Sequence, residues 1–326
     1  MYEIGVDIGG TSIKIGLVNE ALEIAARTSI RFPHEPAERV VAAFSDAIRA
    51  LLREAGVGAE ELGSIGIVVP GSVSADGERV IDAYNLNFHD VPLRRLSQEQ
   101  FPGTPVFLAN DANAAALAEL WKGAFVGCRT AVLFTLGTGL GGGIILGGKM
   151  FNGGMNQGVE LGHAYLVDGG ERCTCGNEGC IEAYCSASAL AREGVRAMKE
   201  HPESLLRARS GGREAEVDAR LVTDCAKEGD ETALRVFRAY LGRLSSACAS
   251  IFNILDPEVL AIGGGLCAAG EFLFGPLQSL VTEKCFYKTR GRVVPAVMGN
   301  DAGMIGAALL RRDAEPHESQ KRGNAK

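Results

Sequence analysis

Hydrophobic and polar positions along the first part of the chain predict strands followed by a helix. Two apolar, β-prone runs, 2–8 and 13–18, flank the polar turn 9–12 and predict a hairpin. A third run at 22–30 would extend this hairpin into a meander. Residues 36–55 carry apolar side chains at the spacing of an amphipathic helix.

Further along, two nearly continuous apolar runs predict strands that are buried on both faces. They span 64–70 and 105–109, and the second leads through Asn110-Asp111 into an alanine-rich helix that reaches Trp121. An order of strands followed by strand–helix–strand is typical of an α/β domain, which is the fold class that the sequence predicts.

A second pattern of the same kind begins near Arg129. Apolar runs at 131–135 and 143–146 again flank a glycine-rich turn, which makes a weak internal repeat of the first hairpin. The remainder of the chain is mostly helical. Its predicted elements are a helix at 230–254 with Asp230 as N-cap and Asp256-Pro257 as its stop, a strand at 258–262 followed by three glycines, a helix at 303–312, and a polar C-terminal tail that is expected to fray.

Composition narrows the class of protein. Hydrophobic residues make up 46% of the 326 residues and charged residues 22%, which supplies a large core and excludes a disordered chain. The net charge of −7 argues against a nucleic-acid partner. No apolar run reaches the roughly 18 residues of a membrane span, and the first residues lack the features of a secretory signal. We therefore expect a soluble, cytoplasmic protein that binds neither nucleic acid nor membrane.

Three of the nine cysteines lie close together behind a histidine, in the pattern His163-x9-Cys173-x-Cys175-x4-Cys180. In a reducing compartment such a cluster indicates a metal rather than disulfides. The four side chains fit a closed tetrahedral Cys₃His zinc site. The alternative, three buried thiols and a core histidine, would not explain the polar, glycine-rich segment around them. Because four protein ligands leave no open position, we predict a structural zinc.

Two familiar phosphate-binding motifs fail on their context. Residues 137–142 match G-x-G-x-x-G, but a predicted strand follows them where a dinucleotide site needs a helix. Residues 143–149 approach a Walker A motif, yet Met150 stands where that motif needs a hydroxyl.

What remains is a pair of glycine turns whose backbone N–H groups can bind phosphate. Either turn alone is better explained as an ordinary hairpin, and Lys14 could equally point to solvent. Together with a third glycine cluster at 263–265, the two turns indicate a nucleotide site. The candidates are Asp7 as a Mg²⁺ ligand through water, Gly9, Gly10 and Thr11 in the first turn, Lys14 as a phosphate partner, and Gly137, Thr138 and Gly139 in the second turn.

Acidic residues mark a second candidate site. Glu160 and Glu182 lie at either end of the predicted zinc loop, which would hold the two carboxylates side by side for sugar hydroxyls; the alternative is two solvated acids. Asn110-Asp111 ends an apolar strand, where open α/β sheets bind ligands. The alternative is a helix N-cap, and both interpretations can hold for different atoms. A carboxylate at this position could accept a proton from a hydroxyl that attacks a phosphoryl group.

These residues resemble the ROK (repressor, open reading frame, kinase) family of bacterial sugar kinases. The resemblance covers residues 2 to about 310. The motifs that carry it are Asp7-x-Gly9-Gly10-Thr11-x2-Lys14, Asn110-Asp111-Ala-Asn113-Ala, Leu136-Gly-Thr-Gly139, Glu160-Leu-Gly-His163 and Cys173-x-Cys175-Gly-x2-Gly-Cys180-x-Glu182.

The resemblance implies a two-lobed, actin-like (ribonuclease-H-like) ATPase fold with duplicated hairpin-containing domains. The smaller lobe would comprise 1–120 plus 300–326, and the larger lobe 121–299 with the zinc loop. A homodimer or homotetramer is also implied. The implied site residues are Asp111 as catalytic base; Gly71, Asn110, Asp111, Glu160, His163 and Glu182 as sugar contacts; Gly264-Gly265 near the adenosine; and His163, Cys173, Cys175 and Cys180 as zinc ligands.

The hypothesis that follows is an ATP- and Mg²⁺-dependent hexose kinase acting on the 6-hydroxyl of an aldohexose, with glucose as first candidate. The alternatives are a kinase for N-acetylmannosamine, N-acetylglucosamine, allose or fructose, and, in another class, a sugar-responsive transcription repressor. Such repressors carry a helix-turn-helix ahead of the first hairpin, which here begins at Tyr2, and the basic surface is missing. Two departures from the family pattern bear on the sugar pocket: Val159 replaces a usual Gly, and Asn87-Phe88 replace a common Gly-Trp.

Overall fold

The computed structural model describes residues 1–155 and 158–314. The chain divides into two compact units. The first contains 1–126, 143–159 and 300–326, and the second contains 127–142 and 160–299. The lobe boundaries expected from the sequence stay a prediction, and the polar tail that was expected to fray lies largely outside the described residues.

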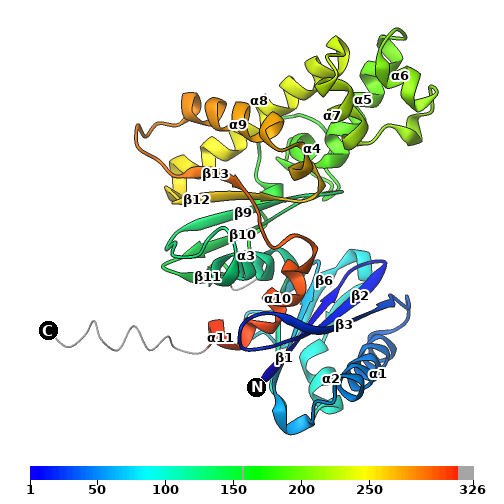
Figure 1. The fold of residues 1–326 in the computed structure, drawn as a ribbon, viewed down its shortest axis with the longest axis vertical. Helices are drawn as coiled ribbons and strands as arrows, with labels where there is room; N and C mark the ends of the chain where they lie inside the picture. Colours follow the sequence, from blue (N-terminus) through cyan, green and yellow to red (C-terminus); the bar gives the residue numbers. More distant parts are fainter. Residues whose placement is uncertain (156–157, 315–326) are drawn as a thin grey trace, which may run out of the picture. The chain divides into compact units, whose positions relative to one another are not determined.

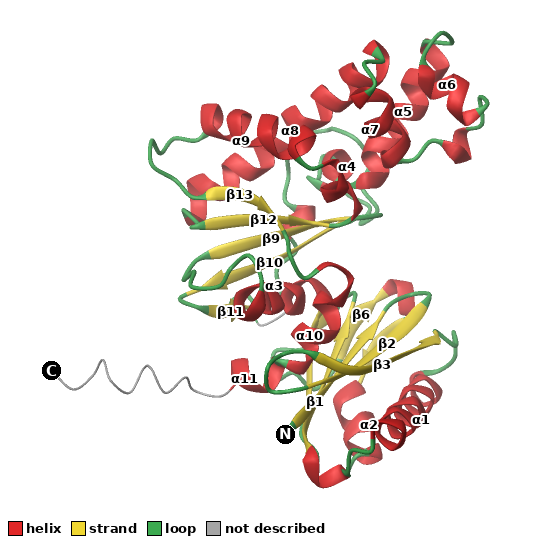
Figure 2. Ribbon diagram, in the orientation of Figure 1, coloured by secondary structure: helices red, strands yellow, loops and turns green. Residues whose placement is uncertain are grey.

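The described strands form three sheets (Figure 2). The strands are β1 (Tyr2–Ile8), β2 (Ser12–Val18), β3 (Ile24–Arg31), β4 (Leu62–Val69), β5 (Ser72–Val73), β6 (Val80–Ala83), β7 (Phe88–Val91), β8 (Val106–Asn110), β9 (Ala131–Leu136), β10 (Leu140–Leu146), β11 (Lys149–Phe151), β12 (Val259–Gly263) and β13 (Arg292–Pro295).

The helices gather mainly in the C-terminal half of the sequence (Figure 1). They are α1 (Ala37–Ala55), α2 (Leu93–Gln100), α3 (Asp111–Lys122), α4 (Glu182–Cys185), α5 (Ala187–Glu200), α6 (Leu205–Ser210), α7 (Ala219–Lys227), α8 (Glu231–Leu255), α9 (Glu271–Lys284), α10 (Ala302–Ala308) and α11 (Leu310–Ala314). Within the described part of the chain, none of them is both long and apolar enough to cross a lipid bilayer.

The first sheet confirms the predicted hairpin and buried strands. Its order is β3-β2-β1-β4-β8, with β1 antiparallel to β2 and parallel to β4. All of β4 is buried, as its continuous apolar run predicts. Two glycines let α10 approach the sheet closely: a Cβ at Gly5 would lie 1.8 Å from the Met304 carbonyl oxygen, and one at Gly66 1.7 Å from that of Ala307.

The second sheet repeats the first. Its order is β11-β10-β9-β12-β13, so β9 and β10 occupy the places of β1 and β2, and β12 runs parallel to both β9 and β13. The weak repeat in the sequence is therefore a duplicated sheet. The strand β10 also explains why the G-x-G-x-x-G match is no dinucleotide fingerprint, because its glycines run into a strand rather than a helix.

Helix α8 begins and ends where the sequence predicts. The Asp230 carboxylate accepts a hydrogen bond from the Ala233 backbone N–H, and the chain leaves the helix at Asp256, which adopts a left-handed conformation before Pro257. The predicted continuous helix at 303–312 is wrong in one detail: it is two short helices, α10 and α11, that meet at Leu309.

Candidate active site and metal centre

The residues of the predicted zinc site come together in the second unit. The ligand atoms of His163, Cys173, Cys175 and Cys180 all lie within 4.8 Å of one another. The Cys175 and Cys180 sulfurs are 3.7 Å apart, and the Cys173 sulfur lies 3.6 Å from His163 Nδ1.

These separations match a tetrahedral zinc. Zn–S bonds of about 2.3 Å place two sulfur ligands roughly 3.8 Å apart, and a Zn–N bond of about 2.0 Å places sulfur and nitrogen roughly 3.5 Å apart. Local backbone geometry makes the tight loop possible, since Gly176 and Gly179 have φ values of +91° and +86°. The donor set and its spacing therefore fit the ion that the sequence predicts.

His163 links the metal site to Glu160. Its Nδ1 faces the sulfurs, and its Nε2 lies 4.0 Å from Glu160 Oε2. Burial raises the pKa of Glu160; His163 opposes this shift, and the nearby Glu182 carboxylate adds to it. The Glu160 side chain is nevertheless 55% exposed, so the alternative of a solvated acid stays open for this residue.

Glu182 is buried, with 8% of its surface exposed, so the alternative of a solvated acid is wrong for this residue. Its Oε2 accepts a hydrogen bond of 2.9 Å from the Leu140 backbone N–H. Its Oε1 accepts one of 2.5 Å from the Thr174 hydroxyl. A Cβ at Gly139 would lie 2.3 Å from Oε2, so a glycine there gives the carboxylate its place beside the turn.

The second glycine turn, Gly137–Leu140, joins β9 to β10. The Gly137 N–H donates to the Gly139 carbonyl at 3.0 Å, and both Gly137 and Thr138 are exposed. Gly264 packs closely against Leu136, the last residue of β9. It has a φ of +97°, and a Cβ there would lie 2.0 Å from the Leu136 carbonyl oxygen. The third glycine cluster, Gly264-Gly265, therefore lies beside the second turn within one unit.

The first glycine turn lies in the other unit, between β1 and β2. The Gly9 N–H donates to the Ser12 carbonyl at 2.9 Å, and Thr11 is exposed. The Lys14 ammonium is 3.8 Å from the Asp7 carboxylate, so Lys14 turns toward the acid. Burial raises the pKa of Asp7, and Lys14 opposes this shift. An acid whose pKa is raised by burial, next to a glycine turn, is typical of a functional site.

Gly303, which the sequence analysis did not single out, makes room for Asp7. A Cβ at Gly303 would lie 2.6 Å from Asp7 Oδ2. The glycine belongs to α10, more than 290 residues along the chain, so no local motif connects the two positions. The one signal in the sequence is a glycine inside a helix, where it weakens the helix by about 1 kcal/mol relative to alanine.

Asn110 and Asp111 stand where β8 ends and α3 begins. The N-cap interpretation of Asn110 is confirmed, because its Oδ1 accepts from the backbone N–H groups of Ala112 and Asn113, while its Nδ2 donates to the Gly71 carbonyl at 3.1 Å. Its role as a ligand contact stays a prediction. Asp111 is half-buried, and its Oδ1 accepts from the Ala112 N–H at 2.8 Å. The pair therefore lies at the carboxyl end of β8, the kind of edge at which open α/β sheets bind ligands.

The departures from the family pattern have local physical reasons. Asn87 has a φ of +55°, and asparagine is one of the few residues other than glycine that tolerate this conformation. Phe88 is buried and packs on Phe32, with ring centroids 6.2 Å apart. Val159 is half-buried at the end of the segment that belongs to the first unit.

The predicted site residues thus form two groups, one on each unit. The first unit carries Asp7, the first turn, Lys14, Gly71, Asn110 and Asp111; the second carries the second turn, Gly264-Gly265, Glu160, Glu182 and the metal ligands. Within its own unit, the structure brings Asn110 to Gly71, Lys14 to Asp7, and Glu182 to both the second turn and the metal loop.

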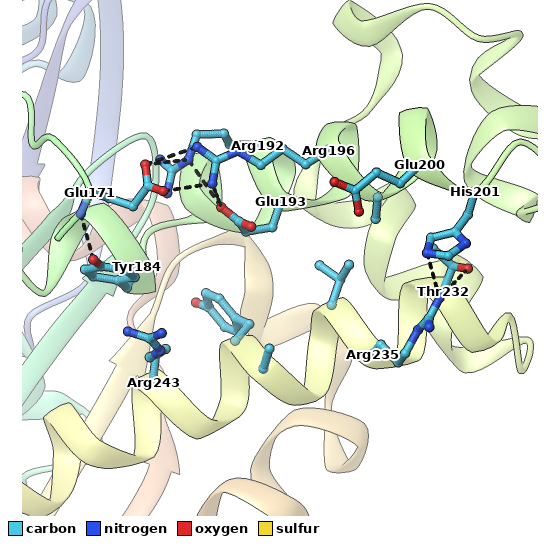
Figure 3. Close-up of a pocket in the computed structure, with 14 residues that line it drawn as sticks. Glu171, Tyr184, Arg192, Glu193, Arg196, Glu200, His201, Thr232, Arg235 and Arg243 are labelled. Atoms are coloured by element: carbon cyan, nitrogen blue, oxygen red, sulfur yellow. Dashed lines mark hydrogen bonds and ion pairs between the residues drawn. The ribbon is translucent and has the colours of Figure 1, made fainter. Parts of the chain in front are cut away.

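A groove between α5 and α8 contains none of the predicted residues (Figure 3). It has a volume of about 500 Å³. Its charged residues largely neutralise one another, because Arg196 contacts both Glu171 and Glu193 at 2.8 and 2.9 Å. Arg243 stacks over Tyr184, with its guanidinium 4.7 Å from the ring centroid. The charged side chains that line the groove are therefore paired with one another, and these ion pairs stabilise this part of the surface.

Comparison with known proteins agrees with this geometry. The model of the family described as "ROK family" matches residues 3–314. A glucokinase of Thermotoga maritima is 37% identical over 95% of this chain and 97% of its own length. The crystal structure of a ROK family glucokinase from Streptomyces griseus, in complex with glucose and AMPPNP, superposes with a TM-score of 0.79 at 32% identity and covers 96% of this chain and 100% of its own.

The structure of a ROK hexokinase from Thermus thermophilus gives a TM-score of 0.80 at 34% identity, over 95% of this chain and 97% of that one. These likenesses cover nearly the whole chain, and they confirm the predicted α/β, actin-like ATPase fold. The chain belongs to the ROK family.

Proposed function

We propose that this protein is an ATP-dependent hexose kinase that transfers the γ-phosphoryl group of ATP to the 6-hydroxyl of an aldohexose, with glucose as the preferred acceptor. The glucokinase and hexokinase relatives support the reaction class. The observation that carries the proposal is the presence in one chain of two glycine turns on duplicated sheets and an Asn-Asp pair at the end of β8.

Asp111 acts as the general base. Its carboxylate accepts the proton of the 6-hydroxyl while that oxygen attacks the γ-phosphorus in line and ADP leaves. Asn110 fixes the start of α3, the helix that carries the acid, by accepting from the Ala112 N–H and donating to the Gly71 carbonyl. Asn110, Gly71, Glu160, His163 and Glu182 provide the contacts that bind the hexose.

The glycine turns bind the phosphates of ATP. The N–H groups of Gly9 and Gly137 close the two turns, and the backbone N–H groups of Gly10 and Gly139 and the hydroxyls of Thr11 and Thr138 donate to phosphate oxygens. Lys14 contributes a positive charge, and Gly264-Gly265 line the adenosine side. Asp7 would hold Mg²⁺ through water, where the ion offsets the charge of the phosphates.

The metal centre would hold one structural Zn²⁺ on His163, Cys173, Cys175 and Cys180, where it fixes the loop that carries the sugar-binding acids. The enzyme would work in the cytoplasm, where ATP is available, as a homodimer or homotetramer. Metal analysis of the purified protein is expected to return about one zinc per chain. A fully active protein without zinc would contradict this part of the proposal.

A panel of acceptors tests the reaction. Purified enzyme is assayed for ADP release with glucose, N-acetylglucosamine, N-acetylmannosamine, allose and fructose, and glucose is expected to give the highest kcat/KM. Asp111→Ala is expected to lower kcat by at least about 100-fold, the lower range of general-base catalysis, while glucose binding by calorimetry persists. Asp46→Ala, an exposed position on α1 that pairs with Arg49, is the matched control. Near-normal turnover of Asp111→Ala would remove it from the role of base.

A further inference from the structure

We propose that Thr174 is a positioning residue that ties the metal loop to the phosphate-binding turn Gly137–Leu140 through the buried carboxylate of Glu182. In this arrangement the metal loop sets the affinity for nucleotide as well as for sugar. The inference rests on the proposed function for the identity of the two ligands, but its structural evidence lies in the second unit alone.

The Glu182 carboxylate is a bridge between two segments. One oxygen accepts the Leu140 N–H of the phosphate turn at 2.9 Å, and the other accepts the Thr174 hydroxyl of the metal loop at 2.5 Å. Only 8% of the residue's surface is exposed. Since hydrogen bonds to a charged, buried group are worth more than those between neutral groups, neither contact is a minor one.

The backbone of the turn contacts both arms of the metal loop. The Ala187 N–H, just beyond the loop, donates to the Gly137 carbonyl at 2.9 Å. On the other arm, a Cβ at Gly162 would lie 2.0 Å from the Leu140 carbonyl oxygen, so the two backbones are in close contact there. The turn is therefore held at its first residue by the start of α5 and at its last residue by the segment that carries His163.

The Thr174 hydroxyl and the Cys173 sulfur contact the same oxygen of the Glu182 carboxylate. The Cys173 sulfur lies 3.4 Å from the Glu182 oxygen that Thr174 also contacts. Of these two contacts the Thr174 hydroxyl makes the shorter, at 2.5 Å against 3.4 Å, and it is the stronger hydrogen-bond donor, so it holds the carboxylate more firmly than the sulfur does.

This bridge gives a coupling between the two substrates. A hexose that binds Glu182 orders the carboxylate that holds the phosphate turn, so it strengthens nucleotide binding, and by reciprocity nucleotide strengthens hexose binding to the same degree. Thr174 carries part of this coupling although it contacts neither substrate in the proposed scheme.

The test uses three variants of the full-length protein. Thr174→Val keeps the shape of the side chain and removes the hydroxyl, and Thr174→Ser keeps the hydroxyl. Thr282→Val makes the same change on the exposed face of α9, where the hydroxyl contacts only its own helix. Because Thr174 is itself exposed, valine there is not expected to prevent folding. Bound zinc and the melting temperature are measured for each variant.

Calorimetry with AMPPNP, alone and with saturating glucose, is the decisive measurement. Thr174→Val is expected to bind AMPPNP roughly 10-fold more weakly than the wild type, the loss that is typical when a residue that orients a ligand-binding group is replaced. It is also expected to lose most of the enhancement of AMPPNP binding by glucose and to keep its full zinc content. Thr174→Ser and Thr282→Val are expected to match the wild type within about twofold. In steady state, KM for ATP rises more than kcat falls.

Equal AMPPNP affinity and equal enhancement in Thr174→Val and the wild type would overturn the inference. Loss of zinc from both Thr174→Val and Thr174→Ser would also overturn the inference. The residue would then act on the metal site in general. A wild-type protein that phosphorylates no hexose would instead refute the proposed function, and the AMPPNP comparison without sugar would still test the bridge between the loop and the turn.

Discussion

The two glycine turns occupy the same place in two sheets of the same strand order, yet the protein holds them in different ways. The first turn is closed by its own backbone, with an ion pair of 3.8 Å between Asp7 and Lys14 beside it. The second turn is held by a buried carboxylate that also contacts the metal loop. The two sheets therefore carry similar turns, and the second is the one that a side chain links to the candidate metal loop.

Removal of the metal is expected to affect the second turn most and the first turn little. Because the small apolar cluster of the loop consists of Cys173, Cys180 and Ala183 with Tyr184 packed against them, we expect the loop to depend on a bound ion for its shape. After chelation, amide hydrogen exchange is expected to accelerate by at least about 10-fold in peptides covering 136–140 and 160–187. Peptides covering 2–18 are the internal control.

Equal acceleration of exchange in both turns would break the comparison, because it would show that the metal stabilises the whole protein. Unchanged exchange in 136–140 with a loosened metal loop would show that Glu182 keeps its place without the metal. Glucose affinity measured on the same chelated sample separates a local change in the loop from global unfolding.

Adding one methyl group to each turn is expected to give unequal losses of stability. A Cβ at Gly139 meets the buried Glu182 oxygen at 2.3 Å, whereas at Gly10 the nearest atom is the Asn85 carbonyl oxygen at 3.5 Å. Gly139→Ala is therefore expected to lower the free energy of unfolding by about 1–3 kcal/mol, as overpacking does. Gly10→Ala is expected to stay within about 0.5 kcal/mol of the wild type. Denaturant unfolding of both variants measures the difference.

If Gly139→Ala is as stable as Gly10→Ala, the Glu182 carboxylate must move without cost and cannot be a fixed bridge. Glu182→Gln together with Gly139→Ala is a useful second measurement. Non-additive changes in the pair would show that the added methyl acts through this carboxylate.

Much of this comparison was visible in the sequence, because it depends on local patterns. The hairpins, the buried strands, helix α8 with its cap at Asp230 and the spacing of the metal ligands all follow from residues that are near one another in the chain. The contacts that distinguish the turns were not visible. Gly303 meets Asp7, and Thr174 meets Glu182, through tertiary packing that has no periodicity.

The interruption of the last helix at Leu309 and the small sheet β5-β6-β7 were also missed. Strands of two to four residues carry too few positions for alternation to be recognised. In the site, the double use of Asn110 as cap and as donor to Gly71 was left open by the sequence, because the partner lies 39 residues away.

Replacing Asp7 by asparagine is expected to stabilise the free protein while it removes activity. The pKa of Asp7 is raised by burial, so the folded state binds the proton more tightly than the unfolded state. Above the raised pKa the ionised acid therefore costs stability, and asparagine does not. The melting temperature of Asp7→Asn is expected to exceed that of the wild type by a few degrees at pH 7.

The same reasoning gives the pH dependence. The advantage of Asp7→Asn shrinks as pH falls through the raised pKa and vanishes below the ordinary value of 3.8, where the wild-type acid is protonated in both states. Asp46→Asn on the surface of α1 is the control, with no comparable gain at pH 7. A lower melting temperature of Asp7→Asn at neutral pH would mean that the ionised carboxylate supports the first turn after all.

The smallest effect is expected from Lys14, and it sharpens the comparison at the first turn. The Lys14 side chain is 41% exposed, so its pair with Asp7 at 3.8 Å is screened by solvent and contributes less than about 1 kcal/mol. Lys14→Gln is expected to change the free energy of unfolding by no more than about 0.5 kcal/mol. It is also expected to raise the pKa of Asp7 further, since the opposing charge is gone. NMR titration of the Asp7 carboxyl carbon measures that shift. A large loss of stability would make the first turn as dependent on one side chain as the second turn is on Glu182.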